Sequence, residues 1–163
     1  MEQLRRDTLL QTTDEELSAL CRLEFCRGSG NGGQKRNKTS SAARVVLLEN
    51  ERFAAEDCSE RSQHANRSQA LRKLRRLIAF EVRSSPALPP HRIDCAITHE
   101  EYPLNLAHLL DVLEEEKYDH KAAAVRCGVT STAFLKLLRR DDELWTKVNN
   151  AREARGLYKL KIN

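Results

Sequence analysis

A glycine-rich segment followed by a glutamine and a run of cations is the part of this sequence best suited to chemistry. Residues 28–33 read Gly-Ser-Gly-Asn-Gly-Gly, with no bulky side chain among them, and Gln34 follows directly. Glycines allow backbone conformations that other residues avoid, and they let a backbone approach a ligand closely. We expect such a segment to be mobile or to be shaped by a partner. The simplest alternative is a flexible hairpin loop without a chemical role.

Two polar blocks narrow the choice. The first, positions 29–44, contains Gly32-Gly33-Gln34 and reads Ser-Gly-Asn-Gly-Gly-Gln-Lys-Arg-Asn-Lys-Thr-Ser-Ser-Ala-Ala-Arg; the second, positions 60–67, reads Glu-Arg-Ser-Gln-His-Ala-Asn-Arg. Together these blocks resemble the catalytic domain of class I peptide chain release factors and of their shorter ribosome-rescue relatives. The resemblance extends over residues 20 to 83. It is specific because both blocks occur in the family's order on a matching predicted frame of strands and helix.

The resemblance implies hydrolysis of the ester that joins a nascent peptide to its tRNA, with water as the nucleophile. In the family, the backbone N–H of the residue at Gln34 faces the charge that develops on the carbonyl oxygen. Loss of such a donor typically slows a reaction by about 100- to 1,000-fold. The Gln34 side chain positions the water, and its amide nitrogen is a candidate for methylation. Gly32 and Gly33 are expected to avoid a collision with the surrounding RNA. No cofactor and no metal ion is implied.

This chain departs from the family pattern directly after the glutamine. Many members have His-Val-Asn-Lys there, whereas this sequence has Lys35, Arg36, Asn37 and Lys38. Arg36 replaces an apolar side chain with a cation, which we expect to strengthen the contact with phosphates near the peptidyl-transferase centre.

Basic residues continue from this loop into a predicted helix. Acidic residues are nearly absent from that helix until Glu81, and a surface of one sign favours binding to ribosomal RNA through phosphates. The alternative is a charged face that only keeps the protein in solution. The predicted RNA-binding residues are Lys35, Arg36, Asn37, Lys38, Arg44, Arg61, Arg67, Arg72, Lys73, Arg75 and Arg76.

Apolar periodicity predicts the elements that position these residues. The spacing of Leu71, Leu74 and Ile78 predicts a long helix from Ser62 to about Arg83, and Arg72, Lys73, Arg75 and Arg76 are expected to face away from that apolar side. Upstream, the pattern predicts a short helix or turn over 14–20 and strands over 20–27, 42–48 and 52–57. The fold class is α+β: a small mixed sheet with a long packed helix, followed by a small all-α, helix-turn-helix-like domain.

A proline-rich stretch separates two predicted domains. We expect a release-factor-like domain over residues 1–85, a linker over 86–103 and a small helical domain over 104–163. In the helical domain, Gly128 is expected to end one helix, and Thr130 and Asp141 to begin the next two. The short turn around Gly128 resembles that of a helix-turn-helix, which suggests a second contact with nucleic acid or the ribosome. A plain helical bundle is the alternative.

Composition and cysteine usage favour a reduced cytoplasmic protein. The 163 residues carry 28 Lys and Arg against 24 Asp and Glu, and the five cysteines form no close pair typical of a zinc site. No signal segment or apolar run of membrane-spanning length is present in the sequence. His91, Cys95 and His99 are spaced by four and would share a face of one helix, but a fourth ligand is not evident. No metal site is therefore expected.

The sequence as a whole predicts codon-independent hydrolysis of peptidyl-tRNA on the ribosome. About 30 residues precede Gln34, which we expect to be too few for a domain that reads stop codons. The expected partners are the large-subunit RNA at the peptidyl-transferase centre and peptidyl-tRNA, without a membrane, and the chain is expected to be a monomer. Two alternatives stay open: a non-catalytic ribosome- or RNA-binding factor, and a nucleic-acid-binding regulator that acts through the C-terminal helices.

Overall fold

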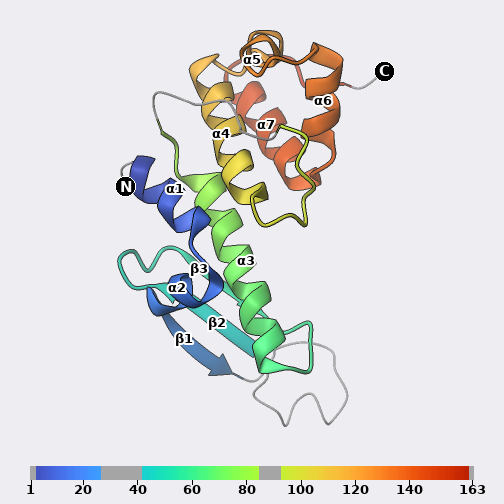
Figure 1. Cartoon of the computed structure of the whole chain (residues 1–163). Helices are drawn as coiled ribbons and strands as arrows, with labels where there is room; N and C mark the ends of the chain where they lie inside the picture. Colours follow the sequence, from blue (N-terminus) through green and yellow to red (C-terminus); the bar gives the residue numbers. More distant parts are fainter. Residues whose placement is uncertain (1–2, 27–41, 85–92, 162–163) are drawn as a thin grey trace. The chain divides into compact units, whose positions relative to one another are not determined.

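The chain divides into two compact units, Met1–Glu81 and Val82–Asn163, here called unit 1 and unit 2 (Figure 1). The computed structural model describes residues 3–26, 42–84 and 93–161. Each unit has its own hydrophobic core, so each is described by itself. None of the described helices is both long enough and apolar enough to cross a bilayer.

The described part of unit 1 combines a small sheet with helices. The strands are β1 (Cys21–Cys26), β2 (Ala42–Leu47) and β3 (Ala54–Asp57), and the helices are α1 (Gln3–Gln11), α2 (Asp14–Ala19) and α3 (Gln63–Glu81). The strand order is β1-β2-β3. These elements confirm the α+β class, the predicted strands to within about two residues and the long helix.

Every described strand pair is antiparallel, whereas we expected a mixed sheet. The physical reason is the short connection between β2 and β3, since strands joined by a hairpin run in opposite directions. The hairpin is closed by the Leu47 N–H, which donates to the Phe53 carbonyl at 2.9 Å.

Helix α3 packs across β2 and β3 and forms the core of unit 1 with them (Figure 1). Val45 and Leu47 of the sheet and Leu71, Leu74 and Ile78 of the helix are fully buried. Burial of each such side chain contributes about 1.5–3 kcal/mol. The predicted apolar side of the helix is therefore the side that fixes α3 on the sheet.

The N-terminal helices also contact α3. Helix α2 begins with a capping box: the Thr13 hydroxyl accepts from the Glu16 N–H at 3.2 Å, and the Glu16 carboxylate accepts from the Thr13 N–H at 2.9 Å. This start confirms the predicted short helix. Helix α1, which the sequence pattern did not reveal, buries Leu9 and Leu10.

Unit 2 is helical in its described part. It contains α4 (Tyr102–Glu115), α5 (His120–Arg126), α6 (Ser131–Arg139) and α7 (Asp142–Ala154). The predicted turn residues are confirmed: Thr130 and Asp141 cap α6 and α7, and Gly128 follows α5 with a φ of +70°. Cys95 and His99 lie in a segment of bends and turns over 93–101, not in the helix that a shared metal-binding face would need.

Candidate functional site

Strand pairing brings the two ends of the glycine-rich segment together. Cys26, the last residue of β1, pairs with Ala42, the first residue of β2. The predicted catalytic residues Gly32, Gly33 and Gln34 and the predicted RNA-binding residues 35–38 belong to residues 27–41, which lie outside the described residues. The segment that carries them leaves and rejoins the sheet at this one pair of strand ends.

The second polar block starts from the same end of the sheet. Ala43, next to Ala42 in β2, pairs with Asp57, the last residue of β3. From Asp57 the chain turns through residues 58–62 and enters α3 at Gln63. The sheet register therefore places the turn with Arg61 and the first turns of α3 with Arg67 at the end where residues 27–41 are attached.

A buried asparagine fixes the turn before α3. The Asn66 side chain is fully buried, and its Oδ1 accepts from the Glu60 N–H at 2.8 Å. Its Nδ2 donates to the Glu60 carbonyl at 2.9 Å. Both polar atoms of the side chain thus hold one backbone residue, which determines how Arg61 leaves the turn.

A charged pair fastens α3 to the end of β3. Asp57 is 6% exposed, and its carboxylate accepts from Lys73 Nζ at 2.8 Å and from the Ser59 hydroxyl at 2.6 Å. Burial alone would raise the pKa of Asp57, but the hydrogen bonds from Lys73 and Ser59 outweigh it and hold the pKa below its ordinary value. Lys73 also donates to the Glu56 carbonyl at 3.0 Å, so this predicted RNA-binding residue is engaged within the protein.

Three of the predicted RNA-binding residues are available to a ligand. Arg61 and Arg72 are exposed and Arg67 is half-buried, and in the part of the chain that the structure describes none of them has an ion-pair partner. Arg67 precedes Leu71 by four residues and therefore shares the side of α3 that faces the sheet. Its position at the first turns of the helix puts its cation toward the sheet end where residues 27–41 are attached.

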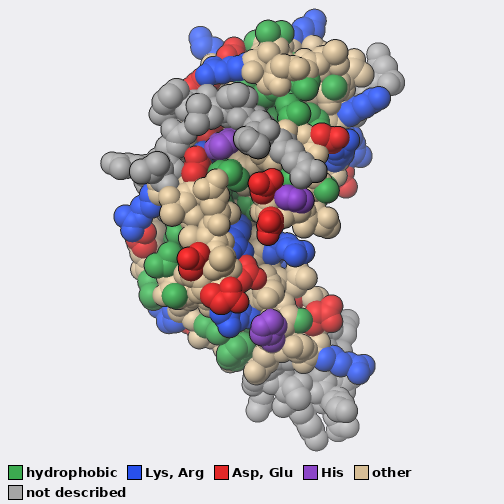
Figure 2. All heavy atoms as spheres, in the orientation of Figure 1, with side chains coloured by type: hydrophobic (Ala, Val, Ile, Leu, Met, Phe, Trp, Pro, Cys, Tyr) green, Lys and Arg blue, Asp and Glu red, His purple; other side chains and the backbone are tan. Residues whose placement is uncertain are grey.

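Two other predicted residues, Arg44 and Arg76, are engaged by neighbouring side chains. Arg44 of β2 donates to Glu24 of β1 at 3.0 Å, and Glu24 also accepts from Arg22 at 2.9 Å. These two hydrogen bonds lower the pKa of Glu24. The Arg76 guanidinium lies 5.4 Å from the centre of the Phe80 ring. In agreement, Figure 2 shows acidic and basic side chains intermingled on the visible face of unit 1 rather than one continuous basic patch.

The structure corrects the expectation for Arg75. We expected it to face away from the apolar side of α3, but it is 9% exposed. Its guanidinium donates to Asp14 at 2.5 Å and to the Thr12 carbonyl at 2.8 Å. A long side chain can cover apolar surface while its charged end finds a partner, and Arg75 thereby links α3 to the start of α2.

Sequence reasoning missed the positioning roles of Asp57 and Asn66. Asp57 lies at the end of a strand, and Asn66 lies inside the second polar block. The sequence alone does not show which groups either side chain will contact in the fold. The only available signal for Asn66 was its place in the resemblance.

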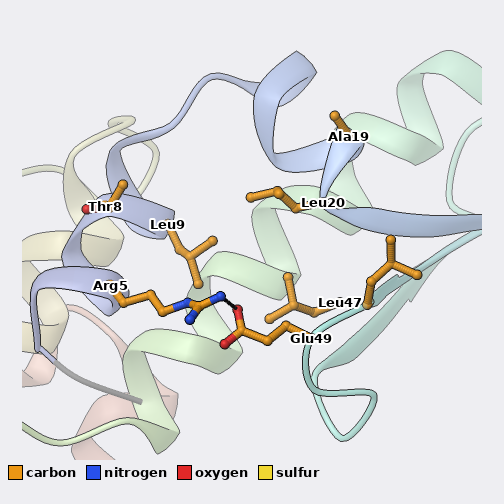
Figure 3. A pocket seen from close by; sticks show the side chains of 8 residues that line it. Arg5, Thr8, Leu9, Ala19, Leu20, Leu47 and Glu49 are labelled. Atoms are coloured by element: carbon orange, nitrogen blue, oxygen red, sulfur yellow. Dashed lines mark ion pairs between the residues drawn. The ribbon is translucent and has the colours of Figure 1, made fainter.

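No candidate metal centre emerges from the described ranges. Among residues 3–26, 42–84 and 93–161, no group of three or more His, Cys, Asp or Glu side chains could hold an ion. A cavity of about 440 Å³ lies between α1, the end of α2 and the end of β2 (Figure 3). Half of its lining residues are leucines, namely Leu9, Leu20, Leu47 and Leu48, and the ion pair Arg5–Glu49 also lines it. It contains none of the predicted site residues.

Comparison with known proteins finds similar sequences for about the first half of the chain. Residues 13–93 match the family model of the RF-1 domain. Over 66 residues the chain is 41% identical to peptide chain release factor 1 of Xylella fastidiosa and 46% identical to that of Paracidovorax citrulli, which in each case covers 40% of this chain and 18% of the relative. It is also 37% identical over 67 residues to peptide chain release factor 2 of Yersinia enterocolitica, again covering 40% and 18%.

These matches concern one segment of much longer proteins. The chain spans about a fifth of the length of the curated relatives that it matches. The search of solved structures found no match to it. The matched residues include β1 to β3 and α3, the elements that carry the two polar blocks. Residues 13–93 therefore match the RF-1 domain, and this part of the chain resembles the catalytic domain of class I peptide chain release factors.

Proposed function

We propose that this chain hydrolyses the ester bond of peptidyl-tRNA on the ribosome, with Gln34 as the catalytic residue. The observation that carries the proposal is the pairing of Cys26 with Ala42 and of Ala43 with Asp57. This pairing attaches the segment with Gly32-Gly33-Gln34 beside Arg61 and Arg67, which have no ion-pair partner among the described residues. A reactive loop flanked by available cations suits a substrate that is itself RNA.

The proposed reaction is direct attack by water. The water oxygen bonds to the ester carbonyl carbon, and the bond from that carbon to the 3′ oxygen of the tRNA breaks. The proton lost by the water ends on the departing 3′ oxygen, which leaves a peptide carboxyl group and a tRNA with a free 3′ hydroxyl. The Gln34 backbone N–H would stabilise the negative carbonyl oxygen of the tetrahedral intermediate.

RNA binding would position the loop rather than take part in bond breaking. Arg61, Arg67 and Arg72 supply the cations of unit 1 in this proposal, together with Lys35, Arg36 and Lys38 of the loop. Arg75 is left out, because its guanidinium is held by Asp14 and Thr12. Contacts to phosphates carry no sequence information, so they suit a site built from ribosomal RNA.

We further propose that release does not depend on a stop codon. About four fifths of each release factor in the comparison lies outside the aligned segment, and we propose that stop-codon reading belongs to that larger part. Rescue of ribosomes stalled without a stop codon is the function that fits this difference.

The test is peptide release from purified ribosomes that hold a radiolabelled peptidyl-tRNA on a truncated mRNA. We expect the wild-type chain to release the peptide at similar rates with or without a stop codon in the mRNA, and Gly33→Ala to abolish most of the release. If the wild type binds these ribosomes but releases nothing, the chain is a non-catalytic ribosome-binding factor. Release that requires a stop codon would refute only the rescue function.

A further inference from the structure

Residues 120–140 of unit 2 stand out by charge. Five of these residues are Lys or Arg and none is Asp or Glu, although the whole chain has 24 acidic residues. The run coincides with α5, the following turn and α6. A single sign of charge over two consecutive helices favours a polyanionic partner. Arg126 of α5 is held by Glu115 and Glu116 of the preceding segment, so the cations to consider are those of α6.

The two helices form a compact helix-turn-helix. The turn from α5 to α6 is short: Gly128 adopts a φ of +70°, and the Thr130 hydroxyl accepts from the Ala133 N–H at 3.2 Å to start α6. Ala124 of α5 and Phe134 and Leu138 of α6 are fully buried. One side of α6 is thereby committed to the core, and the opposite side is presented to solvent.

The exposed side of α6 carries Thr132, Lys136, Arg139 and Arg140. Within the described residues Lys136 has no ion-pair partner. Arg139 and Arg140 contact Asp142 and Asp94, whose side chains are 86% and 73% exposed. Such solvent-exposed pairs are weak, so these arginines can exchange their partners for phosphates. Figure 2 shows basic side chains along the edge of unit 2 that α6 forms.

We propose that the exposed side of α6 binds the phosphate backbone of double-helical RNA. The exposed side chains on this side of α6 are three cations and a threonine, which suit contacts to phosphates, and it offers no Asn or Gln to read adenine and no Asp or Glu to read cytosine. Double-stranded RNA is generally bound in this way, through shape and backbone. The choice of RNA over DNA rests on the proposed function, which places the chain on the ribosome.

The test compares two double variants with equal changes in charge. Lys136→Glu with Arg140→Glu alters α6, where one cation lacks a partner and the other pairs with Asp94. Lys161→Glu with Lys159→Glu is the matched control outside α6, where Lys159 pairs with Glu153 at 3.3 Å. All four side chains are exposed, so both variants should fold, which circular dichroism and thermal melting will verify.

The measurement is the fluorescence anisotropy of a labelled RNA duplex, titrated with the full chain at several salt concentrations. The duplex has about 20 base pairs, which exceeds the ~16 base pairs that a typical double-stranded RNA domain spans. We expect the α6 variant to raise the Kd at least about 10-fold and to lower the salt dependence by about two released counterions. The control should stay within about threefold of wild type, as expected when total charge rather than a contact changes.

Equal losses in the two variants, or no loss in the α6 variant, would overturn the proposal. Tighter α6-dependent binding to a DNA duplex of the same length would overturn the assignment to RNA. Should the α6 double variant fail to melt cooperatively, Lys136→Ala replaces it, because truncation of a side chain without an ion-pair partner removes no internal contact. Peptide release is not measured, so failure here and failure of the hydrolase activity are distinguishable.

Discussion

Substitution of Asn66 by alanine should loosen the turn that leads into α3. The side chain is fully buried, and both of its polar atoms bind the backbone of Glu60, at 2.8 Å and 2.9 Å. Alanine keeps the helix but removes both hydrogen bonds. The backbone of Glu60 then loses the two hydrogen bonds that hold it in place. Glu60 directly precedes Arg61, next to the strand ends where the glycine-rich segment is attached.

The expected cost is about 2 kcal/mol of unfolding free energy. Each lost hydrogen bond contributes about 1 kcal/mol. The space left by the amide adds to the cost, whereas the higher helix propensity of alanine offsets roughly 0.5 kcal/mol. With a urea dependence of about 2 kcal/mol per molar, the unfolding midpoint should fall by about 1 M.

The assay is urea unfolding followed by circular dichroism, with Asn150→Ala as the control. Asn150 lies exposed on α7, and its substitution should change stability by less than about 0.5 kcal/mol. Asn66→Asp should fall between the two, because a carboxylate still accepts from the Glu60 N–H but cannot donate to its carbonyl. If Asn66→Ala is as stable as wild type, the reasoning that this side chain fixes the turn is wrong.

Three further predictions concern other side chains. Because the pKa of Asp57 is held below its ordinary value of 3.8, its contribution to stability is present above pH 3.8 and is lost as the pH falls below the lowered pKa. Urea unfolding of wild type and Asp57→Asn should differ by about 2 kcal/mol at pH 7, and the difference should shrink as the pH falls below 3.8. Burial raises the pKa of Cys127 from 9.0 to about 11. Iodoacetamide at pH 8 should therefore alkylate Cys127 about 100-fold more slowly in the folded than in the unfolded chain. Equal alkylation rates would show that the thiol is not shielded. Asp141→Ala should lower stability by about 3 kcal/mol and Thr130→Ala by about 1 kcal/mol. The buried Asp141 accepts from two backbone N–H groups and from the Tyr102 hydroxyl at 2.6 Å, whereas the exposed Thr130 accepts from one backbone N–H group. A larger loss of melting temperature for Thr130→Ala than for Asp141→Ala would contradict this.

Elements with strong local signals could be predicted from sequence. The alternating residues of β1, the valine-rich run of β2, the apolar spacing of α3 and the capping residues Thr130 and Asp141 each act through neighbours only a few residues away. The structure therefore confirms those elements. The two polar blocks could likewise be found, because a resemblance depends on order and spacing rather than on tertiary contacts.

Other features depend on contacts between distant residues. Helix α1 was missed because its two buried leucines, Leu9 and Leu10, are adjacent and give little helical periodicity. Arg75 was assigned to the wrong side of α3 because its partner Asp14 lies 61 positions away. A helical wheel places each side chain by its angle around the helix alone. Whether a cation can be buried depends on which carboxylate and carbonyl groups the fold brings to it.

The most direct test of the central claim is the rate constant of a single round of peptide release from stalled ribosomes at saturating protein. Gly33→Ala would be compared with Gly28→Ala, a substitution in the same segment but outside Gly32-Gly33-Gln34. The hydrolase proposal predicts at least about a 100-fold loss for Gly33→Ala and a near-normal rate for Gly28→Ala. Equal rates for wild type and Gly33→Ala would show that this loop does not carry the reaction.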